Sequence, residues 1–487
     1  MRKRGLAVAA AVVGLAAFAL AVRARFLLGD PYPFGLDGYY YAVQVRSLCE
    51  SGALNYPTAP LSFYFLAPFA WFAGPIAGAK LGAAAGTALL VVPVYLLGKR
   101  FTGQRAPALV GCAFAATSLQ GFLLSAEFVK EGLGVTVAAF ALVALFAALD
   151  VPTRARIGGA LLLVLIAALT HKTSLAIVFV GFAPATAFAL RTQRRTLVVV
   201  VVALAALCVL GGALAPTRFI GAADLASLAA VARGPLDLTL PTLTAGAPLR
   251  LGHEPVLLAL VVAALLVLEL GRPASGRLPR EALGLLLLAL IVCWPWLDVR
   301  DPKGLGFRLR LLAHLPLALL VGLVTARLLE HAPQRVRAPF VAGVALGLLL
   351  SRPTALHEGV ARTHPTLVAA VRALAGKVPV GSTVITPDRK VAFMARYHAR
   401  QPMRLHPPAR LDVERTFRLI PRDSMRLELR AAFSALRAAP MPGVAPLVDL
   451  HLLEPNGLVL IPERTWQLVL GRLSAPTRRH HRAWPTS

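Results

Sequence analysis

An aspartate follows the first long apolar stretch of this chain. Asp37 belongs to segment 34–41, whose sequence is Phe-Gly-Leu-Asp-Gly-Tyr-Tyr-Tyr. A carboxylate at the edge of a membrane can activate a nucleophile or hold a metal ion. The structural alternative is a helix cap, because an aspartate ahead of an apolar-periodic stretch stabilises a helix N-terminus.

A second acidic group lies between two later apolar runs. Glu127 and Glu131 are spaced so that they would share one face of a helix, and Lys130 stands beside Glu131. Ionisable groups at a membrane edge are costly unless they are paired or used. The alternative is an ion pair that satisfies itself at the end of a span.

Cationic residues interrupt two further apolar regions. His171 and Lys172 suit a phosphate or a proton-transfer partner, although a hairpin turn between two spans explains them nearly as well. Arg308 and Arg310 precede a Pro-containing apolar run. Guanidinium groups bind phosphate oxygens through a planar fork. The alternative is that the two arginine side chains snorkel to the membrane interface.

The composition indicates what must position these groups. The chain has 487 residues, of which 57% are hydrophobic and 15% charged, and its mean hydropathy is +0.68. A soluble globule of this length is excluded, and we predict a membrane all-α fold, a polytopic bundle of about 11 transmembrane helices. The predicted spans are 5–24, 78–98, 106–125, 132–149, 157–171, 173–190, 196–215, 254–270, 281–297, 309–329 and 338–350.

The net charge of +28 reflects how basic residues are distributed over the membrane topology. We do not expect a nucleic-acid partner. Basic clusters recur at alternate loops, as the positive-inside rule requires of cytoplasmic loops. The clusters are Arg2/Lys3/Arg4, Lys99/Arg100/Arg105, Arg154/Arg156, Arg191/Arg194/Arg195, Arg272/Arg277/Arg280 and Arg327/Arg335/Arg337. The N-terminus is then cytoplasmic, and the four groups of candidate residues all fall on the external side.

Two features of the first half leave alternatives open. The first apolar run is predicted to be a retained anchor, with a cleaved signal peptide as the alternative. The external loop 29–77 carries two stretches, 39–54 and 60–72, that are predicted to be juxtamembrane helices. If the aromatic second stretch crossed the membrane instead, the topology after it would be inverted.

The composition changes near residue 351, where short alternating elements replace the long apolar runs. We therefore predict a transmembrane domain over 1–350 and a small soluble external α/β domain over 351–487. Helices are predicted at 366–375, 390–399 and 425–438, and strands at 382–386 and 457–461. The four cysteines show no paired spacing, so neither a disulfide framework nor a zinc site is predicted.

Carboxylates and cations on one membrane face are what a reaction on a lipid-linked phosphate requires. The carboxylates activate a nucleophile or hold a metal ion, and the cations stabilise the leaving phosphate. A transporter that uses the same charges as a translocation path, and a membrane anchor for the basic tail, are the alternatives.

The chain also resembles the GT-C superfamily of polytopic glycosyltransferases, which use polyprenyl-phosphate sugars as donors. Protein mannosyltransferases and the lipid A aminoarabinose transferase are the nearest members. The resemblance rests on the single transmembrane span that precedes the first external loop and on several short motifs. The motifs are Leu36-Asp37-Gly38-Tyr39-Tyr40, the interfacial segment 57–66, Val94-Tyr95-Leu96-Leu97-Gly98-Lys99-Arg100, the second acidic loop and Phe307-Arg308-Leu309-Arg310.

The resemblance implies roles for the candidate residues. Asp37 is similar to the first-loop catalytic carboxylate, and Glu127 or Glu131 to its second-loop acidic partner. Arg308 or Arg310 is similar to the late arginine that contacts the lipid phosphate. Weaker assignments to substrate binding are Tyr40, Lys130, His171 and Lys172. No cofactor is certain; in metal-dependent members Asp37 and Glu127 would hold a divalent cation, Mg²⁺ or Mn²⁺.

Two departures limit the resemblance. The tail lacks the Trp-Trp-Asp signature of oligosaccharyltransferases, which disfavours transfer to peptide sequons. The Lys-Pro-Pro or His-Pro-Pro that often opens the interfacial stretch is here Thr58-Ala59-Pro60. We predict a glycosyltransferase of the inner cell membrane that transfers sugar from a polyprenyl-phosphate donor to a lipid, glycan or protein hydroxyl, with a transporter or flippase as the alternative.

Overall fold

The computed structural model describes residues 2–189, 222–232, 282–294 and 305–350, and parts of the region from 363 to 467. The described residues form two compact units. The first contains residues 1–35 and 44–362, and the second contains 36–43 together with the C-terminal region from 363. Because residues 351–362 lie outside the described residues, the domain boundary at 350/351 stays a prediction.

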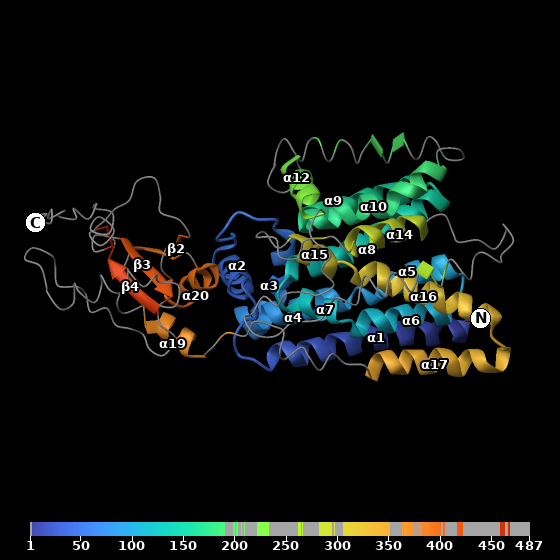
Figure 1. Cartoon of the computed structure of the whole chain (residues 1–487), viewed down its shortest axis with the longest axis horizontal. Helices are drawn as coiled ribbons and strands as arrows, with labels where there is room; N and C mark the ends of the chain where they lie inside the picture. Colours follow the sequence, from blue (N-terminus) through green and yellow to red (C-terminus); the bar gives the residue numbers. More distant parts are fainter. Residues whose placement is uncertain are drawn as a thin grey trace, which may run out of the picture. The chain divides into compact units, whose positions relative to one another are not determined.

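The first unit is a helical bundle, as predicted. Helix α1 lies beside both α4 and α6 (Figure 1), and α17 also packs against α6. Its helices are α1 (Arg2–Leu28), most of α2 (Gly38–Ser51), α3 (Leu61–Ala73), α4 (Pro75–Ala88), α5 (Val91–Thr102), α6 (Arg105–Thr117), α7 (Leu119–Ala126), α8 (Val129–Asp150), α9 (Arg154–Thr170), α10 (Lys172–Ala189), α12 (Ala222–Val231), α14 (Ala282–Val292), α15 (Leu305–Leu311), α16 (His314–His331) and α17 (Gln334–Leu350).

Four helical segments among the described residues are long and apolar enough to cross a membrane: Gly5–Leu28, Pro75–Thr102, Val129–Asp150 and Leu305–His331. The pair α6 and α7 makes a fifth if it counts as one span, although it bends by 45°. The predicted spans 196–215 and 254–270 lie largely outside the described residues. The total of about eleven therefore stays a prediction, whereas the polytopic helical class is confirmed.

The break between α6 and α7 occurs at Ser118. Its backbone is extended (φ −63°, ψ 139°), and its hydroxyl accepts a hydrogen bond from the backbone N–H of Gly121 at 3.3 Å. Ser118 thus caps a new helix instead of continuing the old one. The predicted span 106–125 therefore consists of two helices that bend at Ser118, because a serine competes locally for backbone hydrogen bonds.

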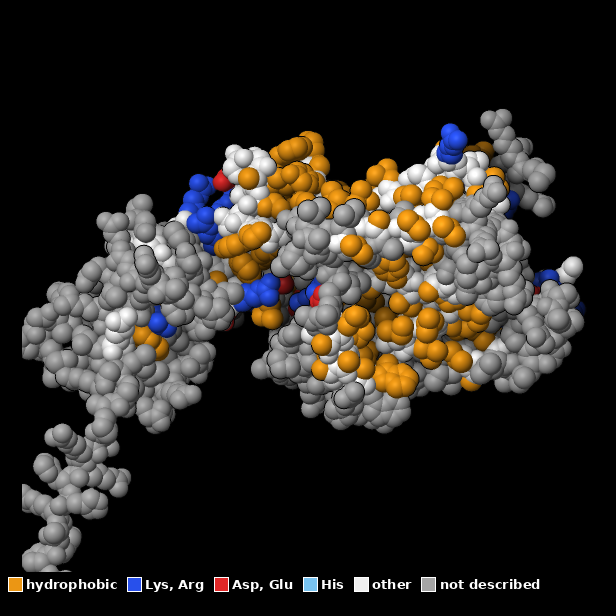
Figure 2. Space-filling model, turned by 90° about the horizontal axis from the view of Figure 1, so that it is seen from above, with side chains coloured by type: hydrophobic (Ala, Val, Ile, Leu, Met, Phe, Trp, Pro, Cys, Tyr) orange, Lys and Arg blue, Asp and Glu red, His pale blue; other side chains and the backbone are white. Residues whose placement is uncertain are grey.

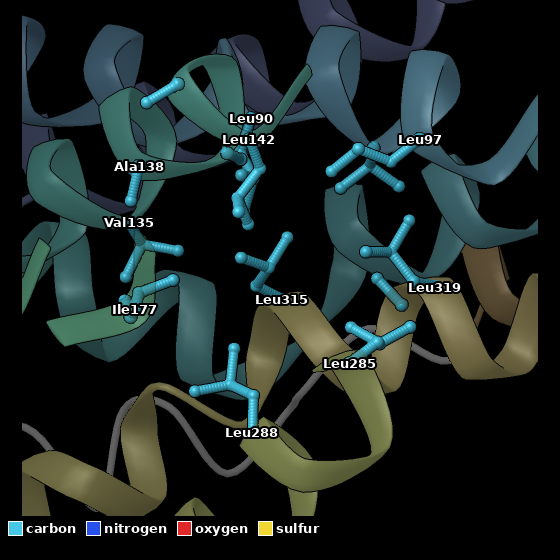
Figure 3. Packing of buried hydrophobic residues seen from close by; sticks show 14 of the residues in the cluster. Leu90, Leu97, Val135, Ala138, Leu142, Ile177, Leu285, Leu288, Leu315 and Leu319 are labelled. Carbon is cyan, nitrogen blue, oxygen red and sulfur yellow. The ribbon is translucent and has the colours of Figure 1, made fainter. Parts of the chain in front are cut away.

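Branched and small apolar side chains fill the core of the bundle. Side chains of α5, α8, α10, α14 and α16 point toward one another in Figure 3. They include Leu97, Val135, Leu142, Ile177, Leu285 and Leu315. Glycines allow the closest approaches: a Cβ on Gly111 of α6 would lie 2.6 Å from the carbonyl oxygen of Ala318 on α16. Close contact at small residues is how membrane helices associate.

The outer surface of this bundle is apolar as well. Figure 2 shows hydrophobic side chains spread over one face of the helical unit. Leu6, Val13, Leu162 and Leu346 are all more than half exposed. An apolar surface of this extent is suited to lipid rather than to water.

The second unit carries a four-stranded sheet in the order β2-β1-β3-β4. Strand β1 (Thr383–Ile385) is parallel to both β2 (Met403–Arg404) and β3 (Thr416–Pro421), and β4 (Leu458–Pro462) is antiparallel to β3. Helices α19 (Pro365–Ala373) and α20 (Arg389–His398) pack together. The predicted α/β class is confirmed, although β2 and β3 were not predicted and the predicted helix 425–438 lies outside the described residues.

Candidate active site

Asp37 occupies the turn directly before α2. Its carbonyl accepts the N–H of Tyr41 at 3.2 Å, which is the first hydrogen bond of the helix. Its carboxylate Oδ1 lies 3.1 Å from Nε of Arg389, the first residue of α20, and both residues belong to the second unit. Asp37 is therefore at the helix start, but its side chain makes an ion pair.

Tyr40 is buried in the same unit, with its ring centroid 5.1 Å from that of Phe393. This position makes Tyr40 a packing residue of the first turn of α2. Its role as a substrate contact stays a prediction.

Glu131 is the centre of the charged cluster in the first unit. It is buried in the first turn of α8, and its Oε1 accepts a hydrogen bond from Nη1 of Arg308 on α15 at 3.2 Å. Nε2 of His171 lies 3.7 Å from the same oxygen. The structure thus brings together three candidates from three separate regions of the sequence.

Arg308 is held by more than the ion pair. Its guanidinium carbon lies 5.2 Å from the ring centroid of Phe128, a cation–π contact. Its side chain is 33% exposed, and its Nε has no hydrogen-bond partner among the described residues. A guanidinium that is held in place and one-third exposed can meet an anionic ligand with its remaining Nη donors.

Arg310 differs sharply from its neighbour, because only 1% of it is exposed. Both arginines lie in α15, near the start of the apolar segment Leu305–His331. Their place at the external mouth of a span stays a prediction. Of the two, Arg308 is the better placed to meet a ligand.

His171 lies between α9 and α10. Its Nδ1 accepts the backbone N–H of Thr173 at 3.3 Å, so in the neutral ring the proton is on Nε2, which faces Glu131. In this tautomer Nε2–H of the neutral ring can donate to a carboxylate or a phosphate.

The two lysines of the candidate set have protein partners. Lys130 donates to Oγ1 of Thr58 at 3.2 Å, which links α8 to the loop ahead of α3. Lys172 is paired with Asp224 of α12. Their roles in phosphate binding stay predictions.

Glu127 is buried beneath Gly35. Glu127 ends α7, and α8 begins only at Val129, so the expectation that Glu127 and Glu131 share one helical face is wrong. Gly35 has φ +70°, and a Cβ there would lie 2.7 Å from Cγ of Glu127. Only Leu36 separates Gly35 from Asp37, and two peptide units reach about 7 Å from Cα to Cα.

Two buried cations that support this region were not singled out from the sequence. Lys80 of α4 donates to the carbonyl of Asp30 and lies 5.1 Å from the ring centroid of Phe34, which fixes the segment before Gly35. Arg23 of α1 donates to the carbonyl of Ala115 at 2.8 Å, at the end of α6. The signal was present in the sequence, because an ionisable residue inside an apolar run is a functional or structural candidate by default.

A metal site is not defined by these residues. Among the described residues, no group of three or more His, Cys, Asp or Glu side chains is arranged to hold a metal ion. The divalent cation at Asp37 and Glu127 stays a prediction.

The described helical bundle and the α/β unit define a polytopic, predominantly helical fold, as the sequence predicted. The chain is similar to the crystal structure of ArnT from Cupriavidus metallidurans bound to undecaprenyl phosphate, with a TM-score of 0.53 and 12% sequence identity. The match covers 95% of this chain and 98% of that one. No protein-family model matches the sequence, and a search of curated proteins found no match.

Proposed function

We propose that this protein is an inverting glycosyltransferase that moves a sugar from a polyprenyl-phosphate donor to an acceptor hydroxyl at the external face of the membrane. The observation that carries the proposal is the contact of Arg308 with buried Glu131 and, beside it, His171. Buried ionisable groups at the ends of apolar helices are costly, and they are retained where they are used.

In this mechanism Asp37 accepts the proton of the acceptor hydroxyl. The hydroxyl oxygen forms a bond to the anomeric carbon, and the bond between that carbon and the phosphate oxygen breaks. The electron pair leaves with the polyprenyl phosphate. Arg308 stabilises the charge that develops on this phosphate, and the Nε2–H of His171 offers a further donor.

Glu131 has a supporting role in this proposal. A buried carboxylate that accepts from Nη1 fixes the direction of the Arg308 guanidinium and leaves its other donors for the phosphate. Glu127, beneath Gly35, supports the loop that leads to Asp37. The undecaprenyl phosphate bound to ArnT in the similar structure supports a donor of the same chemical class.

The bend between α6 and α7 favours a second candidate. Broken helices with buried charges, here Arg23 beside the end of α6, are typical of transporters. A transporter would move a lipid-linked or anionic substrate across the membrane without breaking the bond between sugar and phosphate.

The full-length protein in proteoliposomes distinguishes these functions. We would supply undecaprenyl-phosphate sugars of several classes, a hexose, a pentose and an aminopentose, with a mixture of lipid and glycan acceptors, and measure the undecaprenyl phosphate released. The proposal predicts release that depends on the acceptor. Intact donor recovered from the opposite leaflet, without release, would support the transporter and contradict the transferase.

A further inference from the structure

We propose that Arg389 is a positioning residue for the carboxylate of Asp37. The inference rests on the proposed function, because it assumes that Asp37 is the reacting carboxylate. It assigns part of the chemistry to the C-terminal region, from which no candidate residue was predicted.

The ion pair joins the residue that precedes α2 with the first residue of α20. Nε of Arg389 lies 3.1 Å from Oδ1 of Asp37, which is 16% exposed, while Arg389 is 51% exposed. Asp388 caps α20 by accepting the N–H of Val391 at 3.0 Å on its Oδ1. A capped first turn fixes the backbone from which the arginine projects.

The side chain of Arg389 is also supported from one side. Its guanidinium carbon lies 5.6 Å from the ring centroid of Phe393, one turn further along α20. The same ring packs against Tyr40, whose centroid lies 5.1 Å away. The aromatic ring therefore connects the arginine with the helix that Asp37 begins.

A second contact holds the same turn of α2. Nε of Arg372 donates to Nδ1 of His398 at 3.4 Å, which places the proton of the neutral ring on Nε2. That nitrogen lies 3.1 Å from the hydroxyl of Tyr39. Residues 36–43 thus belong to the C-terminal unit through an ion pair, a hydrogen bond and ring packing.

In this geometry the Arg389 guanidinium can orient the Asp37 carboxylate and still leave one carboxylate oxygen available. The ion pair is formed at one carboxylate oxygen, Oδ1, which has no hydrogen-bond partner among the described residues, and the other oxygen can accept a proton or bind a cation. A guanidinium held by Phe393 restricts the rotation of the Asp37 side chain, and misplacement by about 1 Å can cost about 100-fold in rate. The competing interpretation is an exposed ion pair of little consequence.

The experiment compares Arg389→Gln, Arg389→Lys and Arg396→Gln in the full-length protein, in the assay of donor cleavage described above. Arg396 lies on the same helix and donates to the carbonyl of Arg400, so it controls for loss of one charge from α20. We expect Arg389→Gln to lower kcat about 10-fold to 100-fold with donor KM within about 2-fold. Arg389→Lys should recover part of kcat, and Arg396→Gln should match the wild type.

A double variant tests whether Arg389 acts through Asp37. In the Asp37→Asn background, Arg389→Gln should cause no further loss, because the side chain it orients has already lost its function. An unchanged kcat in Arg389→Gln would overturn the proposal. So would a raised donor KM with unchanged kcat, which would make Arg389 a phosphate ligand instead.

A measurement that does not depend on donor cleavage separates this inference from the proposed function. Asp37→Cys with Arg389→Cys should be joined by a bifunctional thiol reagent whose span matches the two replaced side chains, detected by peptide mapping, and Asp37→Cys with Arg396→Cys should not. Cross-linking in a protein that cleaves no donor would contradict the proposed function but retain the contact. Equal cross-linking of both pairs would overturn the contact itself.

Discussion

The guanidinium of Arg308 donates to the carboxylate of Glu131 at 3.2 Å, although 177 residues separate them in the chain. The contact joins the start of α8 to α15, and Phe128 and Phe307 pack beside it with centroids 5.6 Å apart. Two apolar segments therefore meet through a charged contact. Such a contact is costly to bury, which is why we assign it a function rather than a role in stability alone.

The first prediction concerns the phosphate. Arg308→Gln should weaken binding of undecaprenyl phosphate about 10-fold to 100-fold, because a charged hydrogen bond contributes about 1.5–3 kcal/mol. Native mass spectrometry or thermal-shift titration measures this affinity. Arg154→Gln, an exposed arginine at the start of α9, is the matched control and should bind as the wild type does. Equal affinity in Arg308→Gln would show that the arginine serves Glu131 only.

The second prediction separates backbone strain from contact with Glu127. Gly35 and Gly52 both have φ +70°, but a Cβ on Gly52 would meet nothing within 4 Å. Gly52→Ala should cost about 1–2 kcal/mol from the left-handed conformation alone. Gly35→Ala adds a clash with the Glu127 side chain and should lower both thermal stability and donor cleavage. If Gly35→Ala and Gly52→Ala change thermal stability and donor cleavage to the same extent, the close approach of Gly35 to Glu127 has no effect of its own.

The third prediction tests helix packing at a single glycine. Gly111→Ala should destabilise the bundle, because its Cβ would lie 2.6 Å from the Ala318 carbonyl oxygen and neither backbone can retreat without separating α6 from α16. Gly158→Ala on α9 is the control, since nothing lies within 4 Å of its Cβ. The control should be neutral or stabilising by up to about 1 kcal/mol, the gain in helix propensity. Equal stability of the two variants would contradict the packing.

The single long helices were predictable because they depend on local composition. The runs at 5–24, 132–149 and 157–171 correspond to α1, α8 and α9 within a few residues. The break at Ser118 was not predictable in this way, since the serine lies among small apolar residues and an average over a span conceals it. The same averaging concealed Lys80 and Arg23, single charges inside apolar runs.

The site was predictable only in part. The sequence singled out Glu131, His171 and Arg308 separately, and their contact depends on tertiary packing that no spacing records. Arg389 could not be recognised at all. It lies in a basic region at the opposite end of the chain from Asp37, and nothing distinguishes it there from other surface arginines.

The central claim is that Asp37 carries the reaction. Its most direct test is the rate of release of undecaprenyl phosphate by Asp37→Asn in proteoliposomes, compared with Asp30→Asn. Asp30 lies in the same loop and caps the N–H of Tyr32 at 2.8 Å, a role that asparagine can also fill. We predict that Asp37→Asn loses at least about 100-fold in kcat, while Asp30→Asn stays close to wild type. Full activity of Asp37→Asn would contradict the account.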